Sequence, residues 1–433
     1  MSDTRIIAVR GRRVWDSRGR PTVEAELRLA GGAVGRAIAP AGASTGSGEA
    51  IELRDGGRRL GGRDVRGAVS AIDGEIAAAL TGMDAADQAA LDAALVALDG
   101  TPQKSRLGGN ALVAVSMAAL HAAAAAHGRP LYAYLLGDRG EAVMPLPEIQ
   151  IFGGGAHAGR RVDIQDFMVV APLAVSFDQA LEWTAEVYRA AGAMMEERGL
   201  LQGVADEGGF WPAFDTNEAA LDALMRAIER AGFTPGREIA ISLDIAASEF
   251  HDGTRYRLAR DGRELDSDGL AEMLISWLGR YPIVSIEDPL GEHDRAGLRR
   301  FTQAVGGRVQ IVGDDFLVTD AARVREAAAS GACNAVLVKP NQAGTVTEAK
   351  AALDAARDSG WGAIVSARSG ETEDVTIVHL AVGWGAAQLK VGSFARSERM
   401  AKWNEALRIE EALGPRARFA GTGPLRAKKR AAV

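Results

Sequence analysis

One pattern recurs six times in the chain, in IAISLD (239–244), IVSIED (283–288), VQIVGDD (309–315), AVLVK (335–339), AIVSAR (363–368) and AAQLK (386–390). Each segment is a short apolar run that ends at a charged residue. Alanine-rich segments with helical periodicity separate these runs, as at 319–329 and 346–358. Apolar strands that alternate with amphipathic helices predict a parallel β/α barrel, in which the chemistry gathers at the C-terminal ends of the strands.

The N-terminal part of the sequence has a different pattern. It begins with IIAVRGRRVW, TVEAELRLA and AVGRAIAP, which are separated by glycine-bearing turns and predict a strand meander. Helical patterns follow at 65–80, 87–98 and 111–126, and the last is apolar on all faces, which predicts a buried helix. Strands followed by a block of helices indicate an α+β domain. We place the boundary at the glycine turn 137–140, with an α+β capping domain at 1–137 and the barrel domain at 138–433.

Length and composition narrow the class of protein. The 433 residues are enough for a full barrel and one further domain. A net charge of −7 argues against nucleic acid as the main partner. The single cysteine excludes an internal disulfide framework and favours a reducing, cytoplasmic location. We expect no apolar run long enough to cross a membrane, and hence no membrane partner.

Three of the charged strand ends are acidic. Asp244, Glu287 and Asp314 follow three successive predicted strands. Converging carboxylates without histidine or cysteine suit a hard cation, Mg²⁺ in particular. A surface ring of unrelated charges is the alternative, and the lysines on the next strands make it the weaker one.

Lysine is rare in this chain, with seven residues among 50 basic ones. Two of the seven, Lys339 and Lys390, end predicted strands, where they could also be the solvent-seeking ends of core strands. Lysine can lose its proton and act as a base, whereas arginine stays protonated. Acids beside these lysines predict a metal-assisted removal of a proton next to a carboxylate, on a small anionic substrate.

Nine segments, spread over nearly the whole chain, resemble the enolase (phosphopyruvate hydratase) family. They are WDSRGRPTVE, GASTGSGEAIELRDG, VADEGGF, SLDIAASEF, SIEDPL, VGDDFLVT, LVKPNQAGT, RSGETED and RSERMAKWNEALRIEEALG. The resemblance implies an N-terminal α+β domain followed by an enolase-type modified (β/α)8 TIM barrel. It also implies a homodimer or higher homo-oligomer and the dehydration of 2-phosphoglycerate, a phosphorylated carboxylate, to phosphoenolpyruvate.

The resemblance also implies a role for each matching residue. Asp244, Glu287 and Asp314 resemble the ligands of a tightly held Mg²⁺, and Ser44 belongs to a loop that contributes to a second one. Lys339 would take the C2 proton, and Glu207 would help the C3 hydroxyl to leave. The residues expected to hold the substrate or close over it are Lys390, Arg368, Ser369, His157 and Gln165.

The chain departs from the family pattern on the side expected to handle the leaving hydroxyl. Ala367 stands where the family has a pocket histidine, and Asp166 stands where it has glutamate. We therefore keep a second hypothesis, an enolase paralogue that acts on a modified phospho- or phosphono-substrate, such as a carboxyphosphonoenolpyruvate synthase. A non-catalytic scaffold is a third hypothesis, against which the retained Lys339 and Glu207 speak.

Overall fold

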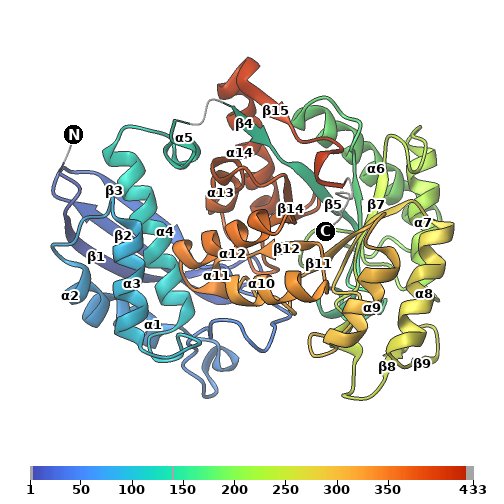
Figure 1. Cartoon of the computed structure of the whole chain (residues 1–433), viewed down its shortest axis with the longest axis horizontal. Helices are drawn as coiled ribbons and strands as arrows, with labels where there is room; N and C mark the ends of the chain where they lie inside the picture. Colours follow the sequence, from blue (N-terminus) through green and yellow to red (C-terminus); the bar gives the residue numbers. More distant parts are fainter. Residues whose placement is uncertain (1–2, 139–140, 426–433) are drawn as a thin grey trace.

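The computed structural model describes residues 3–138 and 141–425. Figure 1 shows a sheet with helices packed on it beside a barrel surrounded by helices. The sequence prediction of an α+β part followed by an eight-stranded β/α barrel is confirmed. The boundary between domains 1–137 and 138–433 stays our proposal, and its residues 139–140 lie outside the described ranges.

The N-terminal part is an antiparallel meander covered by helices. Its strands are paired in the order β1-β2-β3. The strand bounds are β1 Ile6–Trp15, β2 Pro21–Leu29 and β3 Val34–Ile38. The helix bounds are α1 Arg66–Ala71, α2 Ala77–Leu80, α3 Gln88–Asp99, α4 Gly109–Ala126 and α5 Leu131–Leu136, with a π-helical turn joining α1 to α2. All three predicted helices are present.

Helix α4 is the core of this part of the molecule. It lies against β2 and β3 (Figure 1), and nearly all of its side chains are buried. By length and composition it could cross a membrane, so the expectation that no apolar run reaches that length is wrong. Its apolar window is 83% buried inside the structure, which is the environment of a core helix.

Eight strands close the barrel in the order β10-β11-β12-β13-β14-β5-β6-β7. The strand bounds are β5 Leu146–Gly153, β6 Asp166–Val170, β7 Ala240–Asp244, β10 Ile283–Glu287, β11 Gln310–Gly313, β12 Ala335–Val338, β13 Gly362–Ser366 and β14 Gln388–Gly392. The outer helices are α6 Phe177–Glu197, α7 Asn217–Arg230, α8 Ser267–Arg280, α9 Arg295–Val305, α10 Ala321–Ser330, α12 Val346–Asp358, α13 Thr376–Trp384 and α14 Ser397–Leu413, and the short buried helix α11 Pro340–Ala343 follows β12. Two short pairs, β8 Tyr256–Leu258 with β9 Arg263–Leu265 and β4 Ala142–Met144 with β15 Ala417–Phe419, lie outside the barrel.

Strand β6 runs against both of its neighbours, whereas the other neighbouring strands of the barrel are parallel. The glycine-rich segment 154–165 connects β5 directly to β6, and an antiparallel pair can be joined without a crossover helix. The reversal brings the first residue of β6, Asp166, opposite the last residue of β7, Asp244. One additional acid thereby lies at the end of the barrel where the parallel strands finish.

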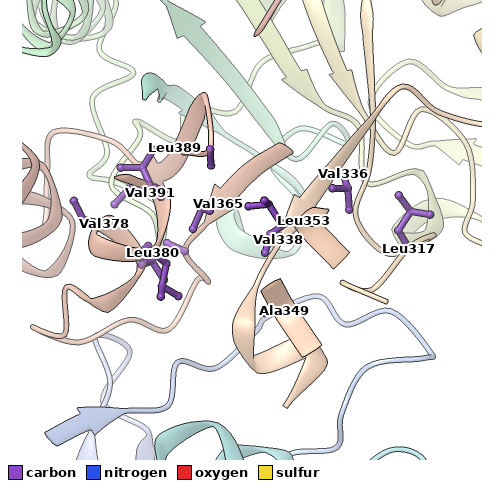
Figure 2. Close-up of a cluster of buried hydrophobic side chains, with 14 of the residues drawn as sticks. Leu317, Val336, Val338, Ala349, Leu353, Val365, Val378, Leu380, Leu389 and Val391 are labelled. Atoms are coloured by element: carbon purple, nitrogen blue, oxygen red, sulfur yellow. The ribbon is translucent and has the colours of Figure 1, made fainter. Parts of the chain in front are cut away.

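Apolar side chains fill the space between the strands and the outer helices. Figure 2 shows Val338 and Val365, from β12 and β13, in the same cluster as Ala349 and Leu353 of α12. These side chains are fully buried, and burial of each valine or leucine contributes roughly 1.5–3 kcal/mol. This packing fixes where each strand ends, and hence where its charged residue lies.

The N-terminal part also caps a helix of the barrel. Ser116 accepts a hydrogen bond from the backbone N–H of Val346 (2.9 Å), and Asp92 accepts one from that of Thr347 (2.9 Å). Both donors belong to the first turn of α12, whose free N–H groups need acceptors. The two parts of the fold are therefore joined by hydrogen bonds from backbone N–H groups to side chains as well as by apolar contact.

A buried histidine cluster lies where α13 meets α4, α5 and α14. The ring of His379 stacks on Tyr132, faces His121 edge-on, and has Nε2 3.4 Å from the carboxylate of Glu405. Burial lowers the pKa of His379 to about 4, although Glu405 and Asp374 oppose this shift. His379 is therefore neutral in the folded protein at neutral pH.

We expect this histidine to make the fold sensitive to mild acid. Below its ordinary pKa near 6.5 the unfolded chain binds a proton that the folded chain does not bind until about pH 4. The contribution of His379 to the free energy of unfolding is therefore fully present above its ordinary pKa. It falls as the pH falls, by about 2 kcal/mol between pH 7 and pH 5. Urea denaturation at both pH values should show this loss in the parent and a smaller one in His379→Gln. Exposed His293→Gln is the control, and equal losses in all three proteins would contradict the prediction.

Candidate active site

The charged strand ends meet at one rim of the barrel, as predicted. Asp244 and Glu287 are the last residues of β7 and β10, and Asp314 directly follows β11. Lys339 directly follows β12, and Lys390 lies in β14. All five side chains are buried.

Lys390 lies among three carboxylates. Its Nζ donates to Asp244 Oδ2 (2.8 Å) and Glu287 Oε2 (2.8 Å), and is 3.3 Å from Asp166 Oδ2. Burial works to lower the pKa of Lys390, but Asp244 and Glu287 outweigh it and hold that pKa well above its usual value. The amide of Gln165 also donates to Asp244 Oδ2 (3.0 Å). Lys390 is thus a fixed positive charge.

Lys339 pairs with the third predicted ligand. Its Nζ donates to Asp314 Oδ2, while Asp314 Oδ1 accepts from the amide of Gln342 (2.9 Å). Burial works to lower the pKa of Lys339, and the Asp314 carboxylate outweighs it and raises that pKa. Gln342 also donates to Glu49 (3.2 Å) and accepts from Thr319 (2.6 Å). The amine is thereby held at one point of the rim.

On the other side of the rim His157 lies between two acids. Its Nδ1 is 3.5 Å from Glu207 Oε1 and 3.8 Å from Asp166 Oδ1, and its Nε2 is 3.0 Å from Ser369 Oγ. Burial works to lower the pKa of His157, but Glu207 and Asp166 outweigh it and raise that pKa. Glu207, His157 and Ser369, three of the predicted site residues, therefore lie in one cluster.

The guanidinium of Arg368 joins the barrel to the N-terminal loop. It donates to both carboxylate oxygens of Glu49 (2.9 and 3.3 Å), to the Ser44 carbonyl (2.9 Å) and to Asn341 (3.2 Å). A Cβ at Gly42 would lie 2.0 Å from this guanidinium, so only glycine allows the loop to pass so close. The structure therefore ties Ser44 to Arg368, and its predicted part in metal binding stays a prediction.

The carboxylates of the rim fit a hard cation. Burial raises the pKa of Glu287 well above its usual value, and Asp244 and Asp314 add to the effect. Its Oε1 is buried without a hydrogen-bond partner, which is the state of an acceptor that lacks its ligand. Buried carboxylate oxygens with no sulfur donor are the ligands that Mg²⁺ and Ca²⁺ prefer.

The closest acidic cluster among the described residues is not the predicted trio. Asp288, Asp314 and Asp315 have carboxylate oxygens within 4.8 Å of one another. Asp288 accepts from the backbone N–H groups of Asp314 (2.9 Å) and Asp315 (2.8 Å), and burial raises its pKa to about 8. Asp244 and Glu287 instead accept hydrogen bonds from Lys390, whereas Asp314 accepts one from Lys339. The three predicted ligands therefore lie at the same rim but not in one cluster.

Some residues of the rim were missed by the sequence interpretation. Glu49 and Gln342 contact the predicted residues Arg368 and Asp314, and Gln150 contacts Asp166, yet none of the three ends an apolar run. Glu49 lies in a glycine-rich loop, where an acid is usually solvated. Gln150 offered the one usable signal, a polar residue inside the buried strand IQIF.

Comparison with known proteins agrees with this architecture. The family described as "Enolase, N-terminal domain" matches residues 6–135, and the family described as "Enolase, C-terminal TIM barrel domain" matches residues 141–428. A curated relative named "Enolase", from Rubrobacter xylanophilus, is 49% identical over 428 residues, which cover 99% of each chain. The similarity extends over both parts of the fold.

We expect Lys390→Met to destabilise the fold strongly, because it leaves three buried carboxylates facing one another. Removal of one partner from a buried ion pair typically costs about 3–5 kcal/mol. Lys350→Met is the matched control, since Lys350 pairs with Asp354 at the surface, where such a pair contributes about 0.3–0.5 kcal/mol. Denaturant unfolding of both variants measures the difference. A loss in Lys390→Met no larger than in the control would contradict this account of the rim.

Proposed function

Since this chain belongs to the enolase family of lyases, we propose that it dehydrates 2-phosphoglycerate to phosphoenolpyruvate. The observation that carries the proposal is the placement of Lys339 and Glu207 at one rim, with Lys390 and Arg368 beside them. A base, an acid and two fixed cations are what this elimination needs. As the resemblance also implies, we expect a homodimer or higher oligomer, and the single cysteine favours a cytoplasmic location.

In the proposed reaction Lys339 Nζ takes the proton from C2 of the substrate. The amine must be neutral when it does so, which lysine can achieve and arginine cannot. Because the Asp314 carboxylate raises the pKa of Lys339, a cation held by Asp314 would have to offset that carboxylate for the amine to lose its proton. Glu207 then gives a proton to the C3 hydroxyl, the C3–O bond breaks, and water leaves as the C2–C3 double bond forms. Each side chain ends the reaction with its proton count changed by one and regains its state from solvent.

The cations of the rim would bind the two anionic groups of the substrate. Lys390, fixed by Asp244 and Glu287, would hold the carboxylate. Arg368 and Ser369 would hold the phosphate, for which a guanidinium is a suitable donor. The present contacts of Arg368 with Glu49 would then compete with the phosphate for its N–H groups.

Asp244, Glu287 and Asp314 would hold Mg²⁺, as the unpartnered oxygen of Glu287 and its raised pKa favour. A bound divalent cation would supply positive charge where negative charge develops on the substrate carboxylate. Gln165 would keep Asp244 oriented through its 3.0 Å hydrogen bond. Ser44 would contribute to a second ion.

A second candidate function is the paralogue that acts on a modified phospho- or phosphono-substrate. The observation that favours it is Ala367, which is buried next to Arg368 and Ser369 and bears only a methyl group there. Of the described histidines only His157 reaches this cluster. The assay below separates the two candidates, because only the first predicts phosphoenolpyruvate from 2-phosphoglycerate.

The proposed reaction has a two-step test. With 2-phosphoglycerate and Mg²⁺, the parent protein should produce enolpyruvate absorbance and exchange the C2 proton with solvent. Lys339→Ala and Lys339→Arg should lose the exchange by at least about 10²-fold, since a positioned base contributes that much. Glu207→Gln should keep the exchange but lose the dehydration. Lys350→Ala controls for the loss of a lysine, and exchange at the parent rate in Lys339→Ala would show that another base acts.

The metal assignment predicts a loss of Mg²⁺ affinity in Asp244→Ala. A residue that only hydrogen-bonds to a metal ligand commonly contributes about 10–100-fold to metal affinity, so a ligand itself should contribute at least that. Calorimetric titration of the substrate-free protein with Mg²⁺ measures the effect without reference to activity. Asp354→Ala, at the surface on α12, is the control. Equal affinity in parent and Asp244→Ala would remove Asp244 from the metal site.

A further inference from the structure

One buried amide connects the two acids on the His157 side of the rim. Gln150 lies in β5 and is almost completely buried. Its Nε2 donates to Asp166 Oδ1, and its Oε1 accepts from the backbone N–H of Gly209 (2.8 Å). Gly209 is two residues from Glu207, the predicted acid.

Only an amide can make both contacts. Asp166 Oδ1 needs a donor and the Gly209 N–H needs an acceptor, and a primary amide carries both on one planar group. Glutamate in its ionised form accepts at both ends, and methionine of similar length offers neither a donor nor a strong acceptor. Each group left unpaired in this buried place would cost roughly 1–3 kcal/mol.

The segment that carries Glu207 is a tight turn that rests on this amide. Ala205 N–H donates to the Gly209 carbonyl (2.8 Å), and Gly208 adopts a φ of +94° that favours glycine. A Cβ at Gly209 would lie 2.5 Å from Gln150 Oε1, so the backbone of the turn passes directly over the amide. The amide of Gln150 is therefore one of the contacts that hold the turn carrying Glu207, beside the hydrogen bond that the Ser393 N–H donates to the Glu207 carbonyl (2.9 Å).

Asp166 depends on the same amide. Its Oδ2 faces Lys390 at 3.3 Å without a hydrogen bond, while Oδ1 accepts from Gln150. Asp166 is one methylene shorter than glutamate, so its carboxylate has less freedom to find another donor. Gln150 therefore also fixes the direction of this carboxylate.

We propose that Gln150 is a positioning residue, which sets the separation of Asp166 and Glu207 across His157 for the departure of the hydroxyl. The inference rests on the proposed function for its kinetic part. It acts through the two acids on the leaving-group side. The hydrogen bonds of Lys339 go instead to Thr319 and Asp314.

Two variants separate the two contacts, and a third is the control. Gln150→Met removes both contacts, whereas Gln150→Glu keeps an acceptor for the Gly209 N–H and places a second carboxylate against Asp166. Gln310→Met removes another buried barrel amide, which contacts Ser285 and Gln388 and lies at the opposite end of the strands. Gln310→Met therefore measures how far the loss of any buried amide from the barrel changes stability and activity.

The first measurement needs no substrate. Amide hydrogen exchange of residues 204–210, followed by mass spectrometry, should become faster in Gln150→Met. It should stay near the parent rate in Gln150→Glu and Gln310→Met. Unchanged exchange of this segment in Gln150→Met, or equal acceleration in Gln310→Met, would overturn the proposal.

The second measurement uses 2-phosphoglycerate. Misplacement of a reacting group by about 1 Å can cost roughly 10²-fold, so we expect a loss of that order in dehydration for Gln150→Met and Gln150→Glu. Exchange of the C2 proton and the KM should stay near the parent values. Equal losses of exchange and dehydration would overturn the proposal. A parent protein that never dehydrates 2-phosphoglycerate would contradict the proposed function instead, and the hydrogen-exchange result alone would then decide the role of Gln150.

Discussion

Buried carboxylates at the rim repel one another, and this repulsion is the constraint on which the rest of the site depends. Asp244, Glu287 and Asp166 share one place that is closed to water, where charges of the same sign destabilise each other strongly. Lys390 offsets that repulsion from the middle of the three. The same arrangement that makes the rim depend on lysine also makes it attractive to a divalent cation.

The reversal of β6 decides which groups reach the rim. A fully parallel barrel would place the first residue of β6 at the far end, away from Asp244. Because β6 runs the other way, Asp166 faces Lys390 and the short connection to β5 carries His157 over the same opening. One change of strand direction therefore supplies the side of the site that lies opposite Lys339.

The sequence predicts the architecture well because its signals are local. Apolar runs with a charged last residue place Asp244, Glu287 and Lys339 at strand ends without any knowledge of long-range contacts, whereas β14 continues two residues beyond Lys390. The partners of these residues cannot be read in the same way. That Glu49 meets Arg368, 319 residues away in sequence, depends on how the two parts pack. The use of Lys390 as the centre of an acid cluster likewise appears only when the barrel is closed.

The caps that Asp92 and Ser116 place on α12 have a consequence for how the protein evolves. Helix α12 takes two of its N-terminal acceptors from the other part of the chain, in addition to its own cap Thr345. If recombination joined this barrel to the N-terminal part of a relative, the N–H groups of Val346 and Thr347 would lose their acceptors unless that relative had acceptors at the same two positions. We therefore expect the two parts to evolve together. Substitutions at Asp92 or Ser116 are constrained by the N–H groups in the first turn of α12, which belongs to the barrel part.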